Sequence, residues 1–127
     1  MARKATAGLT ERESEIMEVL WELESATSEE IRTRLKGKPH DSSVRTLLRI
    51  LIKKKFVKAN AKTRPTQYRA AVRKGKAQQN AVSHLVQRLF GGSPETLVLR
   101  MLENKQLTIE QLEEIKKLAA ENNKEKK

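Results

Sequence analysis

The sequence predicts a mainly α protein with one small β-hairpin: a winged helix-turn-helix domain followed by a helical C-terminal dimerisation region. Three observations predict this fold class. Aromatic residues make up only 3% of the 127 residues, which favours helices over a sheet sandwich. Apolar residues recur at helical spacing along most of the chain. One stretch, residues 56–70, instead has the pattern of two short strands.

Two helices are expected at the start of the chain. Thr10 and Glu13 have the spacing of a capping box, in which each side chain bonds a backbone N–H at a helix start. Thr27 and Glu30 repeat that spacing, and the short helix they begin ends at residues 36–39. The apolar face of the first helix is formed by Ile16, Met17, Leu20 and Trp21.

A third helix is expected from Asp41 or Ser42, either of which can cap it, to about Lys55. Lys55 is expected to turn inward and extend its ammonium group to solvent. The inward stripe of this helix is Val44, Leu47, Leu48, Leu51 and Ile52. Its outer face carries Ser42, Arg45, Thr46, Arg49 and Lys53.

The hairpin and the C-terminal helices follow. Residues 56–60 and 66–70 are expected to pair around a basic loop at residues 61–65. From Arg73 onward the apolar stripes are narrow, and so small a segment seldom buries enough surface to fold alone. We therefore expect it to pack against a second copy. The residues expected at that dimer interface are Val82, Leu85, Leu89, Leu97, Met101, Leu112 and Ile115.

These patterns divide the chain into four segments. A disordered N-terminus is expected at residues 1–8 and a winged-helix domain at residues 9–72. The helical dimerisation region is expected at residues 73–120. The tail at residues 121–127 contains no apolar residue and is expected to be disordered.

Charge is distributed unevenly along the chain. Sixteen basic residues lie between Arg32 and Lys76 with one acidic residue, Asp41, whereas eight glutamates lie between Leu9 and Ile31 with one arginine, Arg12. The net charge is +11. Because binding phosphates releases condensed counterions, such a basic surface favours nucleic acid as partner. We interpret Asp41 as a helix cap and the acidic first helix as the side turned away from DNA.

The outer face of the third helix is a candidate reader of double-stranded DNA. Arginine can bond two acceptors of guanine, and threonine offers thymine a hydroxyl and a methyl. A solvated amphipathic helix is the alternative, but the preceding Gly/Pro turn and the following basic hairpin favour DNA reading. We expect base contacts from Arg45, Thr46 and Arg49. We expect backbone contacts from Ser42, Ser43, Lys53, Lys62 and Arg64.

Other classes of site are not indicated. With no cysteine and two isolated histidines, the sequence predicts neither a metal site nor a cofactor. The glutamates of the first helix form no acid–base pair, so no catalytic residue is assigned and an enzyme is not expected. No apolar segment suits a signal peptide or a membrane span, so we expect a cytoplasmic protein without membrane insertion.

Two stretches resemble the penicillinase-repressor and methicillin-repressor family. The first comprises residues 9–21 together with Ser43-Val44-Arg45-Thr46-Leu47-Leu48-Arg49 and the two residues after it. The second comprises Arg88-Leu89-Phe90-Gly91-Gly92-Ser93 and Leu97-Val98-Leu99. The likeness extends from about Leu9 to Leu118 and implies repression at palindromic operators by a homodimer.

The resemblance also implies a means of relieving repression. Family members that answer β-lactams are cleaved at an Asn-Phe bond in the C-terminal region, and a membrane sensor peptidase acts upstream of them. The aligned bond here is Arg100–Met101, which departs from that pattern. Copper-sensing relatives carry a C-terminal cysteine cluster, and this chain has no cysteine.

Two other binding classes remain as alternatives. One is a non-specific architectural protein that binds DNA or RNA through its basic residues alone. The other is an adaptor whose winged helix binds protein, which the unbroken basic stretch disfavours. A sequence-specific dimeric repressor is the leading hypothesis.

Overall fold

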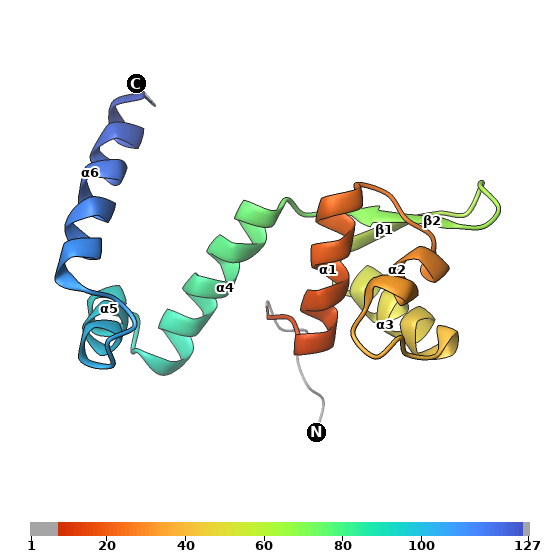
Figure 1. Ribbon diagram of the computed structural model, residues 1–127, viewed down its shortest axis with the longest axis horizontal. Helices are drawn as coiled ribbons and strands as arrows, with labels where there is room; N and C mark the ends of the chain where they lie inside the picture. Colours follow the sequence, from red (N-terminus) through yellow and green to blue (C-terminus); the bar gives the residue numbers. More distant parts are fainter. Residues whose placement is uncertain (1–7, 126–127) are drawn as a thin grey trace. The chain divides into compact units, whose positions relative to one another are not determined.

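A computed structural model describes residues 8–125; residues 1–7 of the predicted N-terminal segment and residues 126–127 of the predicted tail lie outside them. The chain divides into two units, residues 1–84 and 85–127. The elements are α1 (Glu11–Leu23), α2 (Ser28–Arg34), α3 (Asp41–Lys53), β1 (Val57–Asn60), β2 (Gln67–Ala70), α4 (Lys74–Leu89), α5 (Pro94–Glu103) and α6 (Ile109–Glu125) (Figure 1). This mainly helical order with one hairpin confirms the predicted fold class.

Both predicted capping boxes are present. At α1 the Thr10 N–H donates to Glu13 Oε1 at 2.9 Å, and the Glu13 N–H donates to Thr10 Oγ1 at 3.2 Å. At α2 the equivalent bonds between Thr27 and Glu30 measure 2.8 and 3.1 Å. Each box bonds two N–H groups that have no partner within the helix, which sets where the helix begins.

The start of α3 differs from the prediction. The cap position is His40, which makes no side-chain capping bond, and Asp41 is the first helical residue. The Asp41 carboxylate instead binds Arg45 on its own helix and Ser28 of α2. The prediction that Asp41 or Ser42 caps α3 is therefore wrong, although an acid in the first turn still suits the helix dipole.

The core of the first unit lies between its three helices. Seven large side chains from α1, α2 and α3 are at most 1% exposed. Within the stripe predicted for α3, Leu47 is only half-buried and Ile52 is 38% exposed. The stripe is thus narrower than predicted, because Ile52 lies at its edge. The seven fully buried residues are Ile16, Met17, Leu20, Ile31, Val44, Leu48 and Leu51.

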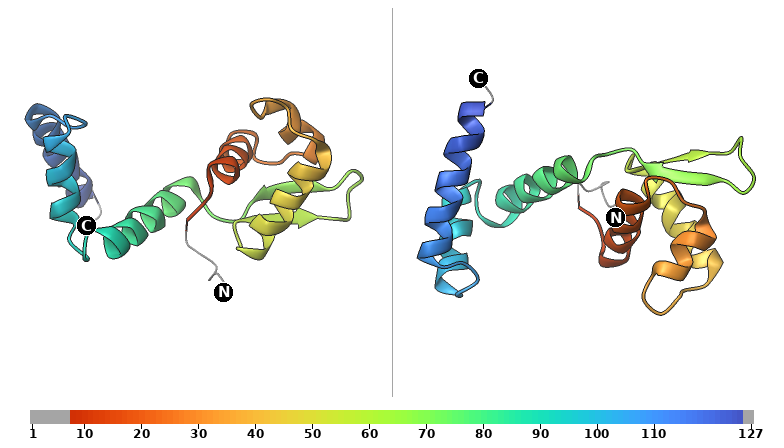
Figure 2. Two further views of the ribbon diagram at one scale, coloured as in Figure 1. Left: turned by 90° about the horizontal axis from the view of Figure 1, so that it is seen from below. Right: turned by 45° about the horizontal axis from the view of Figure 1, so that its top comes forward.

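The hairpin packs its inner side on this core. Its antiparallel register pairs Val57 with Ala70 and Asn60 with Gln67, and Val57 is 2% exposed. A short bridge extends the pairing to the loop after α1, where Ala26 and Tyr68 exchange N–H···O bonds of 2.9 and 2.8 Å. The tip of the hairpin projects away from α1–α3 in every view (Figures 1 and 2).

A partly buried ion pair connects the start of α1 to the end of α3. Lys54 Nζ lies 2.8 Å from Glu13 Oε1, and the two side chains are 17% and 3% exposed. The same Glu13 carboxylate completes the capping box with Thr10. Burial on its own raises the pKa of Glu13, but the bonds to Lys54 and Thr10 outweigh it and place the pKa below the ordinary 4.5 of glutamate.

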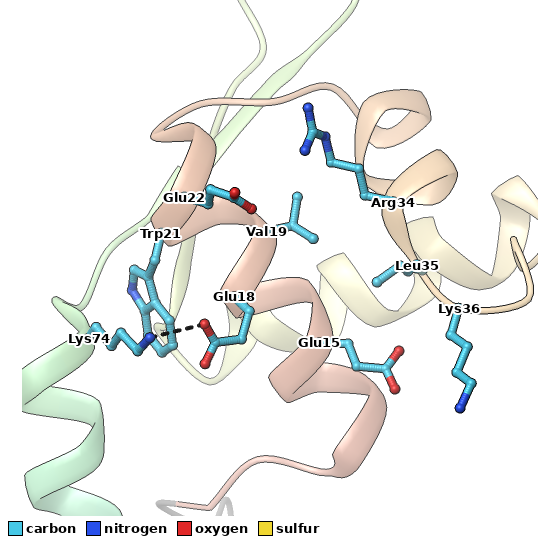
Figure 3. Close-up of a pocket in the computed structure, with 9 residues that line it drawn as sticks. All are labelled: Glu15, Glu18, Val19, Trp21, Glu22, Arg34, Leu35, Lys36 and Lys74. Atoms are coloured by element: carbon cyan, nitrogen blue, oxygen red, sulfur yellow. Dashed lines mark hydrogen bonds and ion pairs between the residues drawn. The ribbon is translucent and has the colours of Figure 1, made fainter.

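A second set of contacts attaches the beginning of α4 to α1. Trp21 Nε1 donates to the Val72 carbonyl at 2.8 Å, and Lys74 Nζ lies 3.2 Å from Glu18 Oε1 (Figure 3). Together they join the outer side of α1 to the segment that follows the hairpin. The first turn of α4 is thereby part of the first unit.

The second unit is poor in buried side chains. None of the residues of α5 is buried, although Ser93 caps it by accepting the Thr96 N–H at 3.2 Å. Thr108 and Gln111 form a reciprocal cap before α6, with bonds of 2.9 and 3.0 Å. Helix α6 continues to Glu125, past the position where the C-terminal tail was predicted to begin.

We predict that Glu13→Gln destabilises the first unit by about 1–3 kcal/mol, because glutamine retains the capping bond but leaves Lys54 without its charged partner. Since the pKa of Glu13 is lowered in the folded protein, this contribution is complete above the unfolded value near 4.5 and is lost as pH falls through the folded value. The difference between wild type and variant should therefore shrink below pH 4.5 in urea denaturation.

Glu22→Gln is the matched control, because Glu22 is exposed on the same helix. It should leave stability and its pH dependence nearly unchanged. If the difference in unfolding free energy between wild type and Glu13→Gln stays constant as the pH falls below 4.5, the pair does not stabilise the fold through its charge.

Candidate nucleic-acid interface

The outer face of α3 consists of exposed polar side chains. Ser42, Arg45, Thr46, Arg49 and Lys53 are all exposed. The opposite side of the helix supplies Val44, Leu48 and Leu51 to the core. The structure therefore brings the predicted α3 residues together on one face that has no packing role.

The two arginines of this face have different surroundings. Arg45 Nε lies 2.8 Å from Asp41 Oδ2, with side chains 61% and 46% exposed. Arg49 and Lys53 have no ion pair among residues 8–125. Arg45 is therefore held at one nitrogen, whereas Arg49 and Lys53 are free to adapt to a ligand.

Thr46 uses its hydroxyl hydrogen within the helix. Its Oγ1 donates to the Ser42 carbonyl at 2.9 Å. The methyl group and the oxygen lone pairs remain for a ligand. Four residues further along the same face, Ile50 is 39% exposed, and it belongs to neither of the faces predicted for this helix.

The first turn of α3 combines exposed serines with a carboxylate. Ser42 and Ser43 are exposed beside Asp41. The serine hydroxyls suit a phosphate, whereas the carboxylate opposes one. The Asp41 charge therefore limits how an anion can approach the helix start.

The hairpin loop presents the remaining predicted cations. Lys62 and Arg64 are exposed, and the Lys62 N–H donates to Asn60 Oδ1 at 3.0 Å. Thr63 Oγ1 lies 3.0 Å from the carbonyls of both Asn60 and Pro65. These local bonds shape the loop and leave its two cationic side chains unengaged within the described chain.

Two cations of the strands were not singled out from the sequence. Lys58 and Arg69 face each other directly in the hairpin register, and both are exposed. Like charges at opposed positions are unfavourable unless an anion lies near them. The strand alternation was the signal that could have placed them on one outer face.

At the end of α3 the structure differs from the prediction made for Lys55. Lys55, predicted to turn inward, is exposed and has a φ of +72°. Lys54 is the inward one, held by Glu13. Helix α3 ends at Lys53, and the backbone changes direction at Lys55. The helical spacing that predicted an inward Lys55 therefore no longer applies there.

The pocket on the outer side of α1 differs from the basic α3 face. Its lining includes the α1 glutamates Glu15, Glu18 and Glu22, balanced by Arg34, Lys36 and Lys74 (Figure 3). Across the described residues there is no group of three His, Cys, Asp or Glu side chains that can hold a metal ion. Nor is any described helix both long enough and apolar enough to cross a membrane.

The predicted dimerisation residues leave much apolar surface uncovered. Val82, Leu85 and Leu89 are 52%, 38% and 73% exposed on α4, and Ile115 is 48% exposed on α6. The other three are half-buried: Leu97, Met101 and Leu112. Arg100–Met101, the bond that aligns with the family's cleavage bond but departs from its pattern, lies inside α5, where Arg100 is paired with Glu103 at 2.9 Å.

Comparison with known proteins gives a family match over most of the chain. The model of the penicillinase repressor family matches residues 9–121. An uncharacterized 16.5 kDa protein in the ptsI 3′ region of Latilactobacillus sakei is 33% identical over 88 residues, which is 68% of this chain and 60% of that protein. The penicillinase repressor of Staphylococcus aureus is 24% identical over 106 residues, which is 82% of this chain and 84% of the repressor.

The family match includes both capping boxes, α3, the hairpin and the C-terminal helices. The chain therefore belongs to the penicillinase repressor family, a family of transcriptional regulators and not of enzymes.

Proposed function

We propose that this protein is a transcriptional repressor that binds palindromic operator DNA as a homodimer in the cytoplasm. One observation carries the proposal: the outer face of α3 consists of exposed donors and has no part in the core. In the winged-helix arrangement the third helix enters the major groove. The penicillinase repressor of Staphylococcus aureus supports a repressor function by its name.

The proposed base readers are Arg45, Thr46 and Arg49. Arg49 has no carboxylate partner among the described residues, so its guanidinium can bond two acceptors of a guanine without breaking an ion pair. Thr46, whose hydroxyl hydrogen is already used by Ser42, would contribute its methyl to a thymine contact. Reading therefore depends on side chains one helical turn apart.

The proposed backbone contacts surround the readers. Lys53 extends the same face toward the end of α3, and the hairpin tip supplies two further cations. Such contacts provide affinity and orientation without reading sequence. This set consists of Ser42, Ser43, Lys53, Lys62 and Arg64.

The proposed dimer uses the apolar side chains of α4, α5 and α6. Four of the seven predicted residues are at least 38% exposed, and exposed apolar surface of this extent is typical of an interface. A two-fold dimer would present two α3 helices to two half-sites, which accounts for a palindromic operator.

We also propose that proteolysis in the C-terminal region relieves repression. A membrane sensor peptidase would act upstream of this cleavage. Because Arg100–Met101 lies within α5, cleavage at that bond requires local unfolding of the helix. Cleavage anywhere in α5 would separate α6 from the DNA-binding unit and weaken the dimer.

We predict that Arg49→Ala lowers affinity for a specific duplex by about 1–3 kcal/mol and relaxes sequence preference. Lys62→Ala should weaken binding to every duplex more evenly and reduce the slope of log K against log salt by about one. Both effects are measurable by fluorescence anisotropy on the tightest duplex from a random library and on a scrambled duplex of equal length.

Lys117→Ala is the control for total charge, because Lys117 is exposed on α6. It should change neither sequence preference nor the salt slope appreciably. Equal losses on specific and scrambled duplexes for Arg49→Ala would remove its reading role and favour a non-specific architectural DNA- or RNA-binding protein.

For the dimer we predict that Leu89→Glu shifts the chain to monomer at micromolar concentration in sedimentation velocity. Leu89 is 73% exposed, so the change should spare the fold while placing a charge in the interface. Asn80→Asp is the matched control, because Asn80 is exposed about two and a half turns away on the opposite side of α4. A wild-type monomer at that concentration would refute the proposed dimer.

A further inference from the structure

We infer that Asp41 is a positioning residue for base recognition by Arg45, with a direct effect on specificity. In this inference the carboxylate holds the Arg45 guanidinium through Nε, so that the two terminal amino groups face the DNA. The inference rests on the proposed function of α3 as the reading helix. It explains why one acid lies within the basic stretch from Arg32 to Lys76.

The geometry gives each carboxylate oxygen a separate partner. Asp41 Oδ2 lies 2.8 Å from Arg45 Nε, one helical turn away. Asp41 Oδ1 accepts a bond from Ser28 Oγ at 3.3 Å. Ser28 is only 9% exposed at the start of α2, so it anchors the carboxylate to the neighbouring helix.

The contact to Nε matters because of how arginine recognises guanine. A guanidinium has five N–H donors, and contacts to guanine O6 and N7 require two of them in a fixed orientation. The ion pair with Asp41 is made at Nε, the nitrogen next to the side-chain stem. It thereby leaves the terminal amino groups available and reduces the conformational freedom that binding would have to remove.

A second cation near Asp41, Arg32, is already paired with Glu29. Arg32 Nε and Nη2 donate to Glu29 at 3.0 and 2.8 Å. The hydrogen bond that Arg32 donates to Glu29 is the main cause of the raised pKa of Arg32, and the charge of Asp41 adds only a smaller contribution. Asp41 is therefore left to Arg45.

A carboxylate at the start of α3 lowers the affinity of the protein for DNA of any sequence. Asp41 begins α3, where it repels DNA phosphates and reduces attraction to any sequence. The favourable contribution of Asp41 must then be to the discrimination between specific and non-specific DNA. Asp41 therefore differs from an ordinary surface acid, because its removal should raise affinity for DNA in general and lower specificity.

The test compares Asp41→Asn with Glu22→Gln, which removes an exposed carboxylate that has no ion pair among the described residues. Binding is measured on the selected and the scrambled duplex. Both variants should bind the scrambled duplex more tightly. Only Asp41→Asn should lower the ratio of specific to scrambled affinity, by about tenfold.

A double-mutant cycle with Arg45→Ala ties the effect to Arg45. In that background Asp41→Asn should leave the affinity ratio unchanged. Ser28→Ala offers a second test, because it keeps the charge but removes the anchor. It should lower the ratio while leaving affinity for the scrambled duplex as in wild type.

The inference is overturned if Asp41→Asn raises both affinities equally, since Asp41 would then act only as a repelling charge. It is also overturned if the ratio falls by the same factor in the Arg45→Ala background. Circular dichroism and thermal melting establish that each variant is folded; if Asp41→Asn is not, Ser28→Ala decides. A wild type that prefers no duplex would instead refute the proposed function itself.

Discussion

The ion pair between Glu13 and Lys54 is the constraint on which the first unit depends most. One carboxylate, 3% exposed, both completes the cap of α1 and binds the lysine that follows α3. A buried charge is tolerated only when it is paired and hydrogen-bonded, so the pair specifies how these two helix ends meet. Once that end of α3 is held, its apolar stripe faces α1 and α2 and its polar stripe faces solvent.

Charge then organises the function of the unit at two levels. The excess of cations in residues 32–76 provides attraction for phosphates, which is independent of sequence. Within that excess, individual ion pairs distinguish the cations from one another. Lys54 pairs with Glu13 and Arg45 pairs with Asp41, whereas Arg49 and Lys53 stay unpaired in the described chain. In the proposed function, folding, reading and backbone contact thus fall to different cations of α3 and its C-terminal cap.

Much of the fold could be predicted from local patterns in the sequence. The capping boxes, the α3 faces and the hairpin depend on spacings of a few residues, and the structure contains them with a narrower apolar stripe on α3 than predicted. Contacts across long separations could not be predicted in this way. Lys54 lies 41 positions from Glu13, and Trp21 lies 51 positions from Val72. No local period encodes either pairing.

The candidate site was predictable to a similar degree. Helical spacing placed Arg45, Thr46 and Arg49 on one face. The same spacing puts Asp41 one turn before Arg45, but the prediction that Asp41 caps the helix left this pair out. The cap position and the first helical position of α3 are adjacent residues. Which of the two Asp41 occupies depends on the side chains that it contacts. The dimer interface remains a prediction, because its partner surface belongs to a second copy.

Hydroxyl-radical footprinting of the full-length protein on its selected duplex tests the central claim most directly. A dimer that reads through two α3 helices should protect two patches related by a dyad, with centres about one helical turn of DNA, or a multiple of it, apart. Uniform protection along the duplex, or a single patch without symmetry, would contradict this account.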